Sequence, residues 1–457
     1  MIDIQNKEKI DLTNKKVTIL GAGKSGISVA ELVKAVGGIP FISEFKNVEN
    51  IELTSFYHEV GGHTLNALDC DLIVISPGIS DRIDIVQKAK LNGIPIVSEI
   101  EIASWFTKKP ILAITGSNGK TTTTMLLQKM CETANLKSEM VGNIGVPFSK
   151  KVKDEISGVL NPDVYVIEVS SFQLEHILHF SPKICSILNF QPDHLDRYDS
   201  FQDYINAKLN IVKNIKESDF FIYNSDDEIL DKIFQKSSEN YIPFSLNMES
   251  RAPFLLNNTK VYFTENGKKT PLFFLEDCKL VGKHNIQNII AAATMAKCFG
   301  IDEKSIREAI ENFEPVPHRI EFSGEINGIK FYNDSKATNI DAVKMALNSF
   351  VNPVTLILGG KDKGNSNFNN LIELNSENIK KIICYGESAE FIYNQLTNFE
   401  NKIKILDFNS AVENAIQNGK NGDIILLSPG CASFDQFNSF EERGNKFKKI
   451  VQEFSNQ

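Results

Sequence analysis

The sequence predicts an α/β protein built from parallel sheets and crossover helices. Short runs rich in Val, Ile and Leu alternate with helical patterns almost throughout, and many of these runs end in loops that contain Gly, Ser or Asn. Parallel strands need helical crossovers, and open parallel sheets bind ligands at the carboxyl ends of their strands. We expect strands at residues 17–20, 72–75, 111–114, 164–167, 184–188, 355–358, 382–385 and 424–427.

The composition is that of a soluble globular protein with several domains. The chain has 457 residues, 42% hydrophobic and 23% charged, and its formal net charge of −9 argues against a nucleic-acid partner. No run approaches the roughly 20 apolar residues that span a bilayer, and the polar start lacks a signal peptide. We therefore expect a cytoplasmic protein that does not bind membranes. The seven cysteines contain no C-x-x-C pair and fit neither a disulfide framework nor a zinc ribbon.

The most informative motif is Gly116-Ser117-Asn118-Gly119-Lys120-Thr121, which lies between the strand at 111–114 and a helix expected over residues 122–134. Glycines let such a loop turn so that backbone N–H groups and the helix N-terminus face phosphate oxygens. A lysine then supplies charge, and a threonine hydroxyl can ligate magnesium. The loop therefore indicates an ATP or GTP site. The usual pattern has glycine where this chain has Ile114, so a glycine-rich turn is the alternative.

Further polar side chains follow the strands around this loop. Glu168 ends the strand at 164–167, which suits a magnesium ligand beside a phosphate loop, although a capping glutamate is the alternative. The strand at 184–188 leads into a polar segment with His194, for which a site role is favoured over a structural one. Asn285 and Asn288 share one helical face and suit the edge of a base, or act as N-caps. Spacing alone leaves Lys208 as a surface lysine.

The first glycine loop, residues 21–26, follows a strand, and the next strand ends at Glu44. This spacing is close to a dinucleotide-binding fingerprint and, alone, favours an NAD oxidoreductase. The same loop can hold any nucleotide diphosphate at a helix N-terminus, or be only a tight turn. Two further loops, at residues 76–78 and 142–145, are either ligand-facing or simple turns.

Two connectors, at residues 105–110 and 313–318, predict three domains: 1–108, 109–315 and 316–457. The first and third are expected to be Rossmann-like, and the central one to be a phosphate-loop domain with a mostly parallel sheet. Residues 219–280 are irregular, with a hairpin near 261–267. Four polar segments in the third domain, at 317–319, 334–339, 359–363 and 428–435, indicate a binding face with both charge signs, suited to an anionic partner.

Taken together, these segments resemble the Mur ligases of peptidoglycan synthesis. The resemblance rests on TGSNGKTTT, EVSSFQLE, NFQPDHLDRY, GKHNIQN, PHR, DSKATN and SPGCASFDQF, and covers nearly the whole chain. The family's own phosphate loop lacks the first usual glycine, which accounts for Ile114. The SSFQLE, DSKATN and CASFDQF forms are similar to members that add D-glutamate. The resemblance thus implies an ATP-dependent ligase that joins D-glutamate to UDP-N-acetylmuramoyl-L-alanine through an acyl phosphate, and we expect a monomer.

The resemblance also implies roles for individual residues. Catalytic positions are Lys120, His194, Lys208 and Lys336. ATP contacts are Gly116, Ser117, Asn118, Gly119, Lys120, Thr121, Thr122, Asn285, Asn288, His318, Arg319 and Asp334. Magnesium ligands are Thr121, Glu168, His194 and Lys208, with Lys208 carbamylated so that its amine carries oxygen ligands. The UDP-linked substrate matches Lys24, Ser25, Glu44, Ser76, Gly78 and Asn143. D-Glutamate matches Thr338, Lys363, Ser433 and Phe440.

Two alternatives compete with this interpretation. One is another Mur ligase, or an enzyme resembling folylpolyglutamate synthetase, that adds a different amino acid. The other is an NAD oxidoreductase, which leaves Lys120, Glu168 and the whole third domain without a role. With an ATP site between the second and third domains, catalysis implies closure by the last domain.

Overall fold

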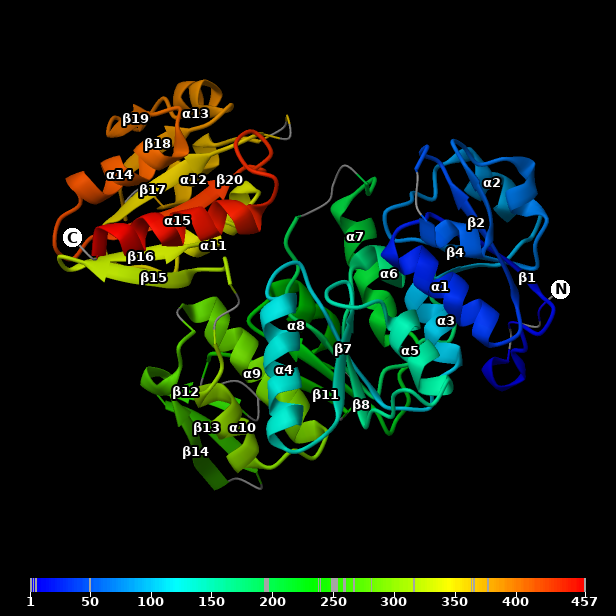
Figure 1. Cartoon of the computed structure of the whole chain (residues 1–457). Coiled ribbons are helices and arrows are strands. Elements are labelled where there is room, and N and C mark those ends of the chain that lie inside the picture. The colour runs from blue at the N-terminus through cyan, green and yellow to red at the C-terminus, as the bar shows by residue number, and fades with distance from the viewer. Residues whose placement is uncertain are drawn as a thin grey trace. The chain divides into compact units, whose positions relative to one another are not determined.

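The computed structural model describes residues 2, 4, 6–48, 51–192, 197–236, 238, 240–247, 254–257, 260–265, 268–280, 282–314, 317–362, 364, 366–375 and 378–455. The chain forms two compact units, which Figure 1 shows as a colour-graded ribbon. The first unit comprises Met1–Cys278 and Gln287–Phe313, and the second comprises Lys279–Ile286 and Glu314–Gln457. Both units are α/β, as the sequence predicts.

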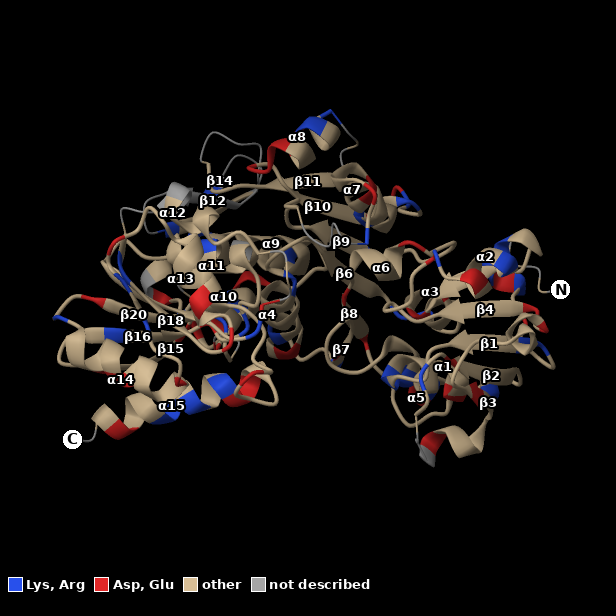
Figure 2. Cartoon of the chain, turned by 90° about the horizontal axis from the view of Figure 1, so that it is seen from above, with Lys and Arg blue, Asp and Glu red and all other residues tan. Residues whose placement is uncertain are grey.

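The first sheet of unit one is entirely parallel, with strand order β3-β2-β1-β4-β5. Figure 2 shows β4, β1, β2 and β3 side by side in that order. This order reverses between β1 and β4, the position at which open α/β sheets bind their ligands. Its elements are β1 Lys16–Leu20, α1 Lys24–Ala35, β2 Ile39–Glu44, β3 Tyr57–Val60, β4 Leu72–Ile75, α2 Asp84–Leu91, β5 Ile96–Ser98 and α3 Glu99–Trp105.

The second sheet of unit one is also parallel, with order β11-β10-β9-β6-β8-β7. Its central strand β6 lies between β8 and β9, so the carboxyl ends of these three strands meet at one edge. The elements are β6 Ile111–Thr115, α4 Lys120–Thr133, β7 Ser138–Gly142, α5 Phe148–Ile156, β8 Val164–Glu168, α6 Ser171–Leu174, β9 Ile184–Ile187, α7 Phe201–Leu209, β10 Phe220–Asn224, α8 Glu228–Phe234 and β11 Tyr241–Phe244.

The two sheets of unit one share a hydrophobic core. Leu32 of α1 and Ile100 of α3 are buried in the same cluster as Phe148 of α5 and Tyr165 of β8. Figure 1 shows α1, α3 and α5 side by side. The buried carboxylate of Glu99 in α3 also accepts a 2.6 Å hydrogen bond from the backbone N–H of Ser149 in α5. The helices of the first sheet are therefore built into the core of the second.

A small antiparallel sheet and two helices complete unit one. The sheet consists of β12 Phe254–Asn257, β13 Lys260–Glu265 and β14 Lys268–Phe274, so the predicted hairpin is confirmed. Helix α9, Lys283–Cys298, begins in unit two and continues in unit one, where α10, Glu303–Glu311, follows it.

Unit two contains one mixed sheet, with order β15-β16-β20-β17-β18-β19. Only the β15–β16 pair is antiparallel; the other described pairs are parallel. The elements are β15 Glu321–Ile326, β16 Ile329–Asn333, α11 Ile340–Leu347, β17 Val354–Gly359, α12 Asn369–Asn375, β18 Ile379–Tyr385, α13 Ala389–Gln395, β19 Lys402–Lys404, α14 Phe408–Asn418, β20 Ile424–Gly430 and α15 Phe440–Ser455.

All eight predicted strands are confirmed, with ends that differ by at most three residues. The expected loop at 428–430 instead extends β20, because Gly430 still pairs with Gly359 of β17.

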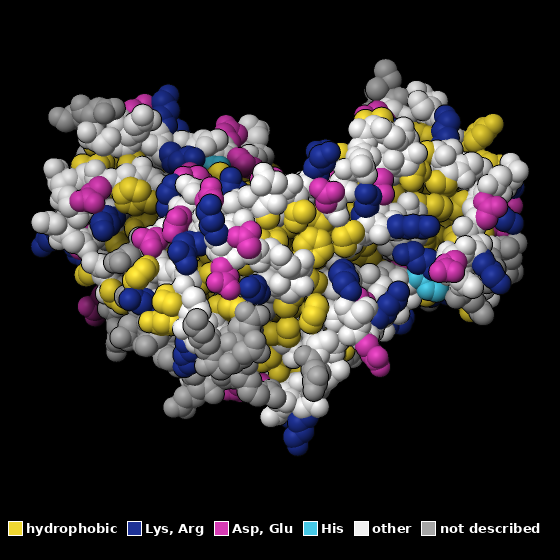
Figure 3. Space-filling view, turned by 90° about the horizontal axis from the view of Figure 1, so that it is seen from below, with side chains coloured by type: hydrophobic (Ala, Val, Ile, Leu, Met, Phe, Trp, Pro, Cys, Tyr) yellow, Lys and Arg dark blue, Asp and Glu magenta, His cyan; other side chains and the backbone are white. Residues whose placement is uncertain are grey.

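Figure 3 shows hydrophobic, basic and acidic side chains mixed on the face seen from below, so charge alone marks no binding site there. None of the helices in the described part of the chain is long and apolar enough to cross a membrane.

Candidate active site

The phosphate-loop motif forms the turn between β6 and α4. Gly116 and Gly119 both have positive φ, +152° and +84°. Any residue other than glycine would be strained at these two positions. A Cβ on Gly119 would lie 2.2 Å from Oδ1 of Asn288, so only glycine lets this loop approach α9. The loop leads directly into α4, whose first-turn N–H groups lack intrahelical acceptors. Ser117 to Thr122 thus lie at a loop and helix N-terminus of the kind that favours an anion.

Two basic side chains converge on the carbonyl oxygen of Gly116. Nζ of Lys120 donates to the carbonyl oxygens of Gly116 and Ser117, at 2.8 and 2.9 Å. Nζ of Lys208 donates to the same Gly116 oxygen at 2.8 Å and lies 4.7 Å from the ring centroid of Tyr204. Lys208 is only 1% exposed. The lysine that spacing alone leaves at the surface is therefore buried beneath the phosphate loop.

Glu168, at the end of β8, carries an unusual buried carboxylate. It is 2% exposed, and its Oε1 accepts a 2.8 Å hydrogen bond from Nδ2 of Asn143. No described residue donates a hydrogen bond to Oε2. A buried carboxylate oxygen without a donor is costly unless a cation neutralises it, and magnesium prefers oxygen ligands of this kind. The Glu168 carboxylate therefore fits the role of a magnesium ligand. Among the described residues, no group of three His, Cys, Asp or Glu side chains is placed to hold a metal.

A cavity of about 830 Å³ lies at the carboxyl ends of the strands in the first sheet. It is lined by five of the six residues predicted to bind the UDP-linked substrate: Lys24, Ser25, Glu44, Ser76 and Gly78. The sixth, Asn143, instead contacts Glu168 in the second sheet. The cavity lies at the switch point between β1 and β4, beside the N-terminus of α1, which is the combination that favours a diphosphate.

Hydrogen bonds keep the Glu44 carboxylate ionised at the cavity wall. Burial acts to raise its pKa, but the backbone N–H groups of Lys46 and Ala22, at 2.9 and 2.8 Å, outweigh burial and lower the pKa. Burial also lowers the pKa of His63, against the opposing charges of Glu59 and Glu44. The ring of His63 lies 5.9 Å from that of Phe45, and both rings line the cavity. The cavity thus offers an ionised acceptor and two aromatic rings.

In unit two, Asp334, Lys336 and Thr338 follow β16, Ser433 follows β20, and His318 and Arg319 precede β15. Oδ2 of Asp334 accepts a 2.7 Å hydrogen bond from the Ser428 hydroxyl, and Oδ1 accepts from the N–H of Ile320 at 3.3 Å. Burial raises the pKa of Asp334 to about 7, although these hydrogen bonds and the charge of Arg319 act against burial. Asp334 therefore holds the turn that contains Arg319.

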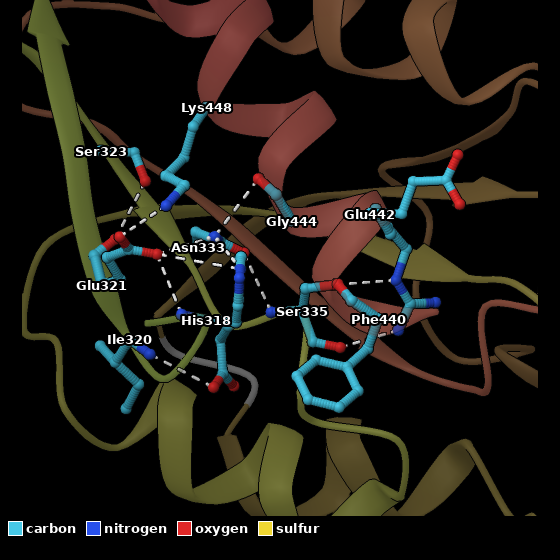
Figure 4. Close-up of polar contacts among 12 residues, drawn as sticks. His318, Ile320, Glu321, Ser323, Asn333, Ser335, Phe440, Glu442, Gly444 and Lys448 are labelled. Atoms are coloured by element: carbon cyan, nitrogen blue, oxygen red, sulfur yellow. Dashed lines mark hydrogen bonds and ion pairs between the residues drawn. The ribbon is translucent and has the colours of Figure 1, made fainter. Parts of the chain in front are cut away.

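That turn is strained, and a second carboxylate, that of Glu321, also holds it. His318 and Ile320 both have left-handed backbones, with φ of 64° and 45°, which is rare for non-glycine residues. Figure 4 shows the Glu321 carboxylate accepting from the N–H of His318, from Nδ2 of Asn333 and from Nζ of Lys448. The distances are 2.9, 3.0 and 2.9 Å. Glu321 therefore fixes the direction of the Pro-His-Arg turn.

The buried side chain of Arg443 connects the loops that follow β16 and β20 through hydrogen bonds. Arg443 of α15 is fully buried and donates to Oγ and the carbonyl oxygen of Ser335, to the Tyr385 hydroxyl and to the Cys431 carbonyl oxygen. Ser335 in turn donates to the carbonyl oxygen of Phe440 at 2.8 Å. These contacts join the segments that carry the predicted residues Lys336, Ser433 and Phe440. Nζ of Lys336 lies 5.4 Å from the Phe440 ring centroid.

Comparison with protein families identifies three matching models. The model described as "Mur ligase middle domain" matches residues 114–296. The model described as "Mur ligase, glutamate ligase domain" matches residues 318–431, and the one described as "MurD N-terminal domain" matches residues 16–85. A protein of Christiangramia forsetii named UDP-N-acetylmuramoylalanine--D-glutamate ligase is 39% identical over 96% of this chain and 99% of its own length. One of Koribacter versatilis with the same name is 38% identical, over 98% and 99%. The chain belongs to the Mur ligase family.

Solved structures agree with this Mur ligase in fold. The crystal structure of MurF ligase from Thermotoga maritima in complex with ADP has a TM-score of 0.60 at 16% identity and covers 98% of this chain and 97% of its own. The MurC structure from Thermotoga maritima has a TM-score of 0.58 at 19% identity, with coverage of 96% and 100%. The family assignment decides against the NAD oxidoreductase, and ATP use follows from the family.

The structure places most of the predicted residues of this Mur ligase in three groups: around the phosphate loop, around the cavity, and at the strand ends of unit two. His194 and Lys363 lie outside the described residues. Asn288 belongs to unit one and Asn285 to unit two, although both lie on α9. Thr338 follows β16 and is half-buried. The roles of these residues stay predictions.

Residues that sequence reasoning did not select also contribute to these groups. Phe45 and His63 line the cavity, Tyr204 donates to or accepts from Ser117 at 3.0 Å, and Glu321 and Arg443 hold the loops of unit two. The one available signal is helical spacing, which puts Tyr204 and Lys208 on the same face of α7. For the others, the sequence carries no local signal.

Proposed function

We propose that this Mur ligase joins D-glutamate to UDP-N-acetylmuramoyl-L-alanine with hydrolysis of ATP to ADP and phosphate, in the cytoplasmic synthesis of peptidoglycan precursors. The observation that carries the proposal is the match to relatives of that name over 96% and more of both chains. We also propose the three-domain division 1–108, 109–315 and 316–457, and a monomer as the active form.

The cavity of the first sheet is proposed to bind the UDP part of the substrate. The α1 N-terminus with Lys24 and Ser25 binds the diphosphate, and Glu44 accepts hydrogen bonds from the nucleoside. Because the two sheets of unit one share a core, the bound substrate is held in a defined position relative to the phosphate loop. Asn143, which lies beside Glu168 rather than at the cavity, is then suited to the muramoyl-alanine end.

The first chemical step is proposed to occur at the phosphate loop. A carboxylate oxygen of the alanine attacks the γ-phosphorus of ATP, and ADP leaves, which yields the acyl phosphate. Lys120 neutralises phosphate charge after exchanging its contacts to Gly116 and Ser117 for phosphate oxygens. Magnesium, when bound, would neutralise further phosphate charge, and Thr121, Glu168, His194 and a carbamylated Lys208 would hold it. The orphaned Oε2 of Glu168 supports this assignment.

The second step is proposed to use the residues of unit two. The D-glutamate amine attacks the acyl carbon, and phosphate leaves from the tetrahedral intermediate. Thr338, Lys363, Ser433 and Phe440 are proposed to hold D-glutamate. His318, Arg319, Asp334 and Lys336 act on ATP and on the acyl phosphate, and Asn285 and Asn288 contact the adenine. Both steps bring anionic groups together, so positioning and charge neutralisation account for catalysis.

The decisive experiment measures phosphate release from ATP with UDP-N-acetylmuramoyl-L-alanine and a panel of amino acids. We expect turnover with D-glutamate only, and none when the UDP-linked substrate is omitted. Equal rates with L-lysine or meso-diaminopimelate would overturn the choice of amino acid, and release without any amino acid would overturn the ligase assignment.

A further inference from the structure

In the 189–199 segment of unit one, of which residues 189–192 and 197–199 are described, the first described part contacts the phosphate loop and the second contacts the wall of the cavity. At its start, the backbone N–H of Asn118 donates to Oδ1 of Asn189 at 2.9 Å. The Ser117 hydroxyl contacts the carbonyl oxygen of Gln191 at 3.0 Å. The beginning of the segment is therefore tied to the loop that binds the phosphates of ATP.

At the other end of the segment, Arg197 holds the cavity wall. Its Nη1 donates to the carbonyl oxygen of Pro77 at 2.6 Å, and its Nη2 donates to that of Ile79 at 2.8 Å. Pro77 and Ile79 both line the cavity, together with the predicted substrate residues Ser76 and Gly78. The two hydrogen bonds come from one planar guanidinium, so they fix the wall in both position and orientation.

Arg197 is itself held in place from several sides. Its guanidinium carbon lies 3.9 Å from the ring centroid of Phe172, within the range of a cation–π contact. Its Nη2 lies 3.7 Å from the Glu175 carboxylate, which also accepts a hydrogen bond from the Tyr198 hydroxyl. The Arg197 side chain is 17% exposed, so these contacts are largely shielded from water.

A neighbouring ion pair provides a contrast. Arg82, which follows the 76–79 loop, forms a 2.6 Å ion pair with Asp199, which follows Arg197. The side chains of Arg82 and Asp199 are 59% and 84% exposed. Exposed pairs of this kind contribute little. The link between the segment and the cavity wall therefore depends on Arg197.

We propose that Arg197 is a positioning residue for the UDP-linked substrate. It holds the 76–79 loop at a fixed place relative to the phosphate loop, so that a substrate bound in the cavity presents its carboxylate to ATP. Arg197 acts through the carbonyl oxygens of Pro77 and Ile79 and does not itself contact the reacting atoms. The proposal rests on the proposed function, because it assumes that the cavity binds the UDP part of that function's substrate.

The test compares Arg197→Ala, Arg197→Lys and the matched control Arg82→Ala in the full-length protein. The measurements are the KM values for UDP-N-acetylmuramoyl-L-alanine, ATP and D-glutamate, and the Kd for UDP by calorimetry. We expect Arg197→Ala to raise the KM for the UDP-linked substrate by about tenfold or more, because two charge-assisted hydrogen bonds are lost. Arg197→Lys should fall between the wild type and Arg197→Ala, since a lysine lacks the planar fork. Arg82→Ala should stay within about twofold.

A merely structural role would raise all three KM values together, and that result would overturn the proposal. So would unchanged values in Arg197→Ala, or equal effects in Arg82→Ala. If Arg197→Ala does not fold, Arg197→Lys carries the test alone: a KM for the UDP-linked substrate equal to the wild-type value would overturn the proposal. The Kd for UDP separates this proposal from the proposed function. Weaker UDP binding in Arg197→Ala supports the positioning role even if D-glutamate proves to be the wrong amino acid.

Discussion

The Asn143 amide donates a 2.8 Å hydrogen bond to Oε1 of Glu168, whereas Oε2 of the same carboxylate accepts none from any described residue. Asn143 also donates its backbone N–H to the carbonyl oxygen of Glu168 at 2.8 Å. These two contacts orient the carboxylate at the end of β8 and leave one buried oxygen for a cation. A substitution of Glu168 is therefore the most specific test of the proposed magnesium site.

Glu168→Gln should lower turnover by about a hundredfold or more and raise the magnesium concentration needed for half-maximal phosphate release. Its melting temperature without magnesium should not fall, because a buried amide carries no charge to desolvate. The matched control is Glu139→Gln, which removes a carboxylate of neighbouring β7 that pairs with Lys151 at 2.8 Å. An unchanged magnesium titration in Glu168→Gln would reject the ligand role.

Lys208→Ala should lose about a hundredfold in turnover, and bicarbonate or short carboxylates should restore part of it, because they replace the oxygen ligands of a carbamate. In protein equilibrated with ¹³C-bicarbonate, a carbamate resonance should appear in the wild type and be absent from the variant. Lys213→Ala is the control, since Lys213 also donates to a backbone carbonyl, that of Ile177 at 3.3 Å. Wild-type rates in Lys208→Ala would refute the role.

Asp334→Asn should change how stability depends on pH. Burial raises the pKa of Asp334 to about 7 in the folded protein, above the value of 3.8 for an unperturbed aspartate, so the folded state holds an extra proton between these values. Stability contributed by this group is present below about pH 4 and is lost as the pH rises to about 7, with a slope of at most about 1.4 kcal/mol per pH unit. Melting temperatures across this window should fall more steeply with rising pH in the wild type than in Asp334→Asn. Parallel curves would contradict the assignment.

Glu321→Ala should lower the free energy of unfolding by about 2 kcal/mol, because the N–H of His318, the Asn333 amide and Lys448 all lose their acceptor. The KM for ATP should also rise, since the left-handed residues around Arg319 lose their support. Glu325→Ala, an exposed position on the same strand, is the control and should change stability by less than about 0.5 kcal/mol. Denaturant titration and ATP kinetics provide the measurements. A KM for ATP equal to that of the control would show that the turn does not need Glu321.

The sequence alone predicts the parts of this protein that depend on local pattern. Apolar runs of strand length correctly locate β1, β6 and β8, because burial on both faces of a parallel sheet requires consecutive apolar residues. The phosphate loop and Glu168 follow directly from their positions at strand ends. The same applies to Glu44, whose strand ends at the cavity. In each case the sequence signal lies within one strand–loop–helix segment.

Tertiary structure alone decides which of these strand–loop–helix segments lie next to one another. Lys208 reaches Gly116 across 92 positions of sequence, and Arg197 reaches Pro77 across 120. No periodicity within a short window encodes such pairings, because they depend on how two sheets and their crossover helices pack into one core. The same packing places Asn143 at Glu168 rather than at the cavity. The sequence by itself determined the chemical groups at the strand ends, whereas long-range packing decided which of them lie within reach of one another.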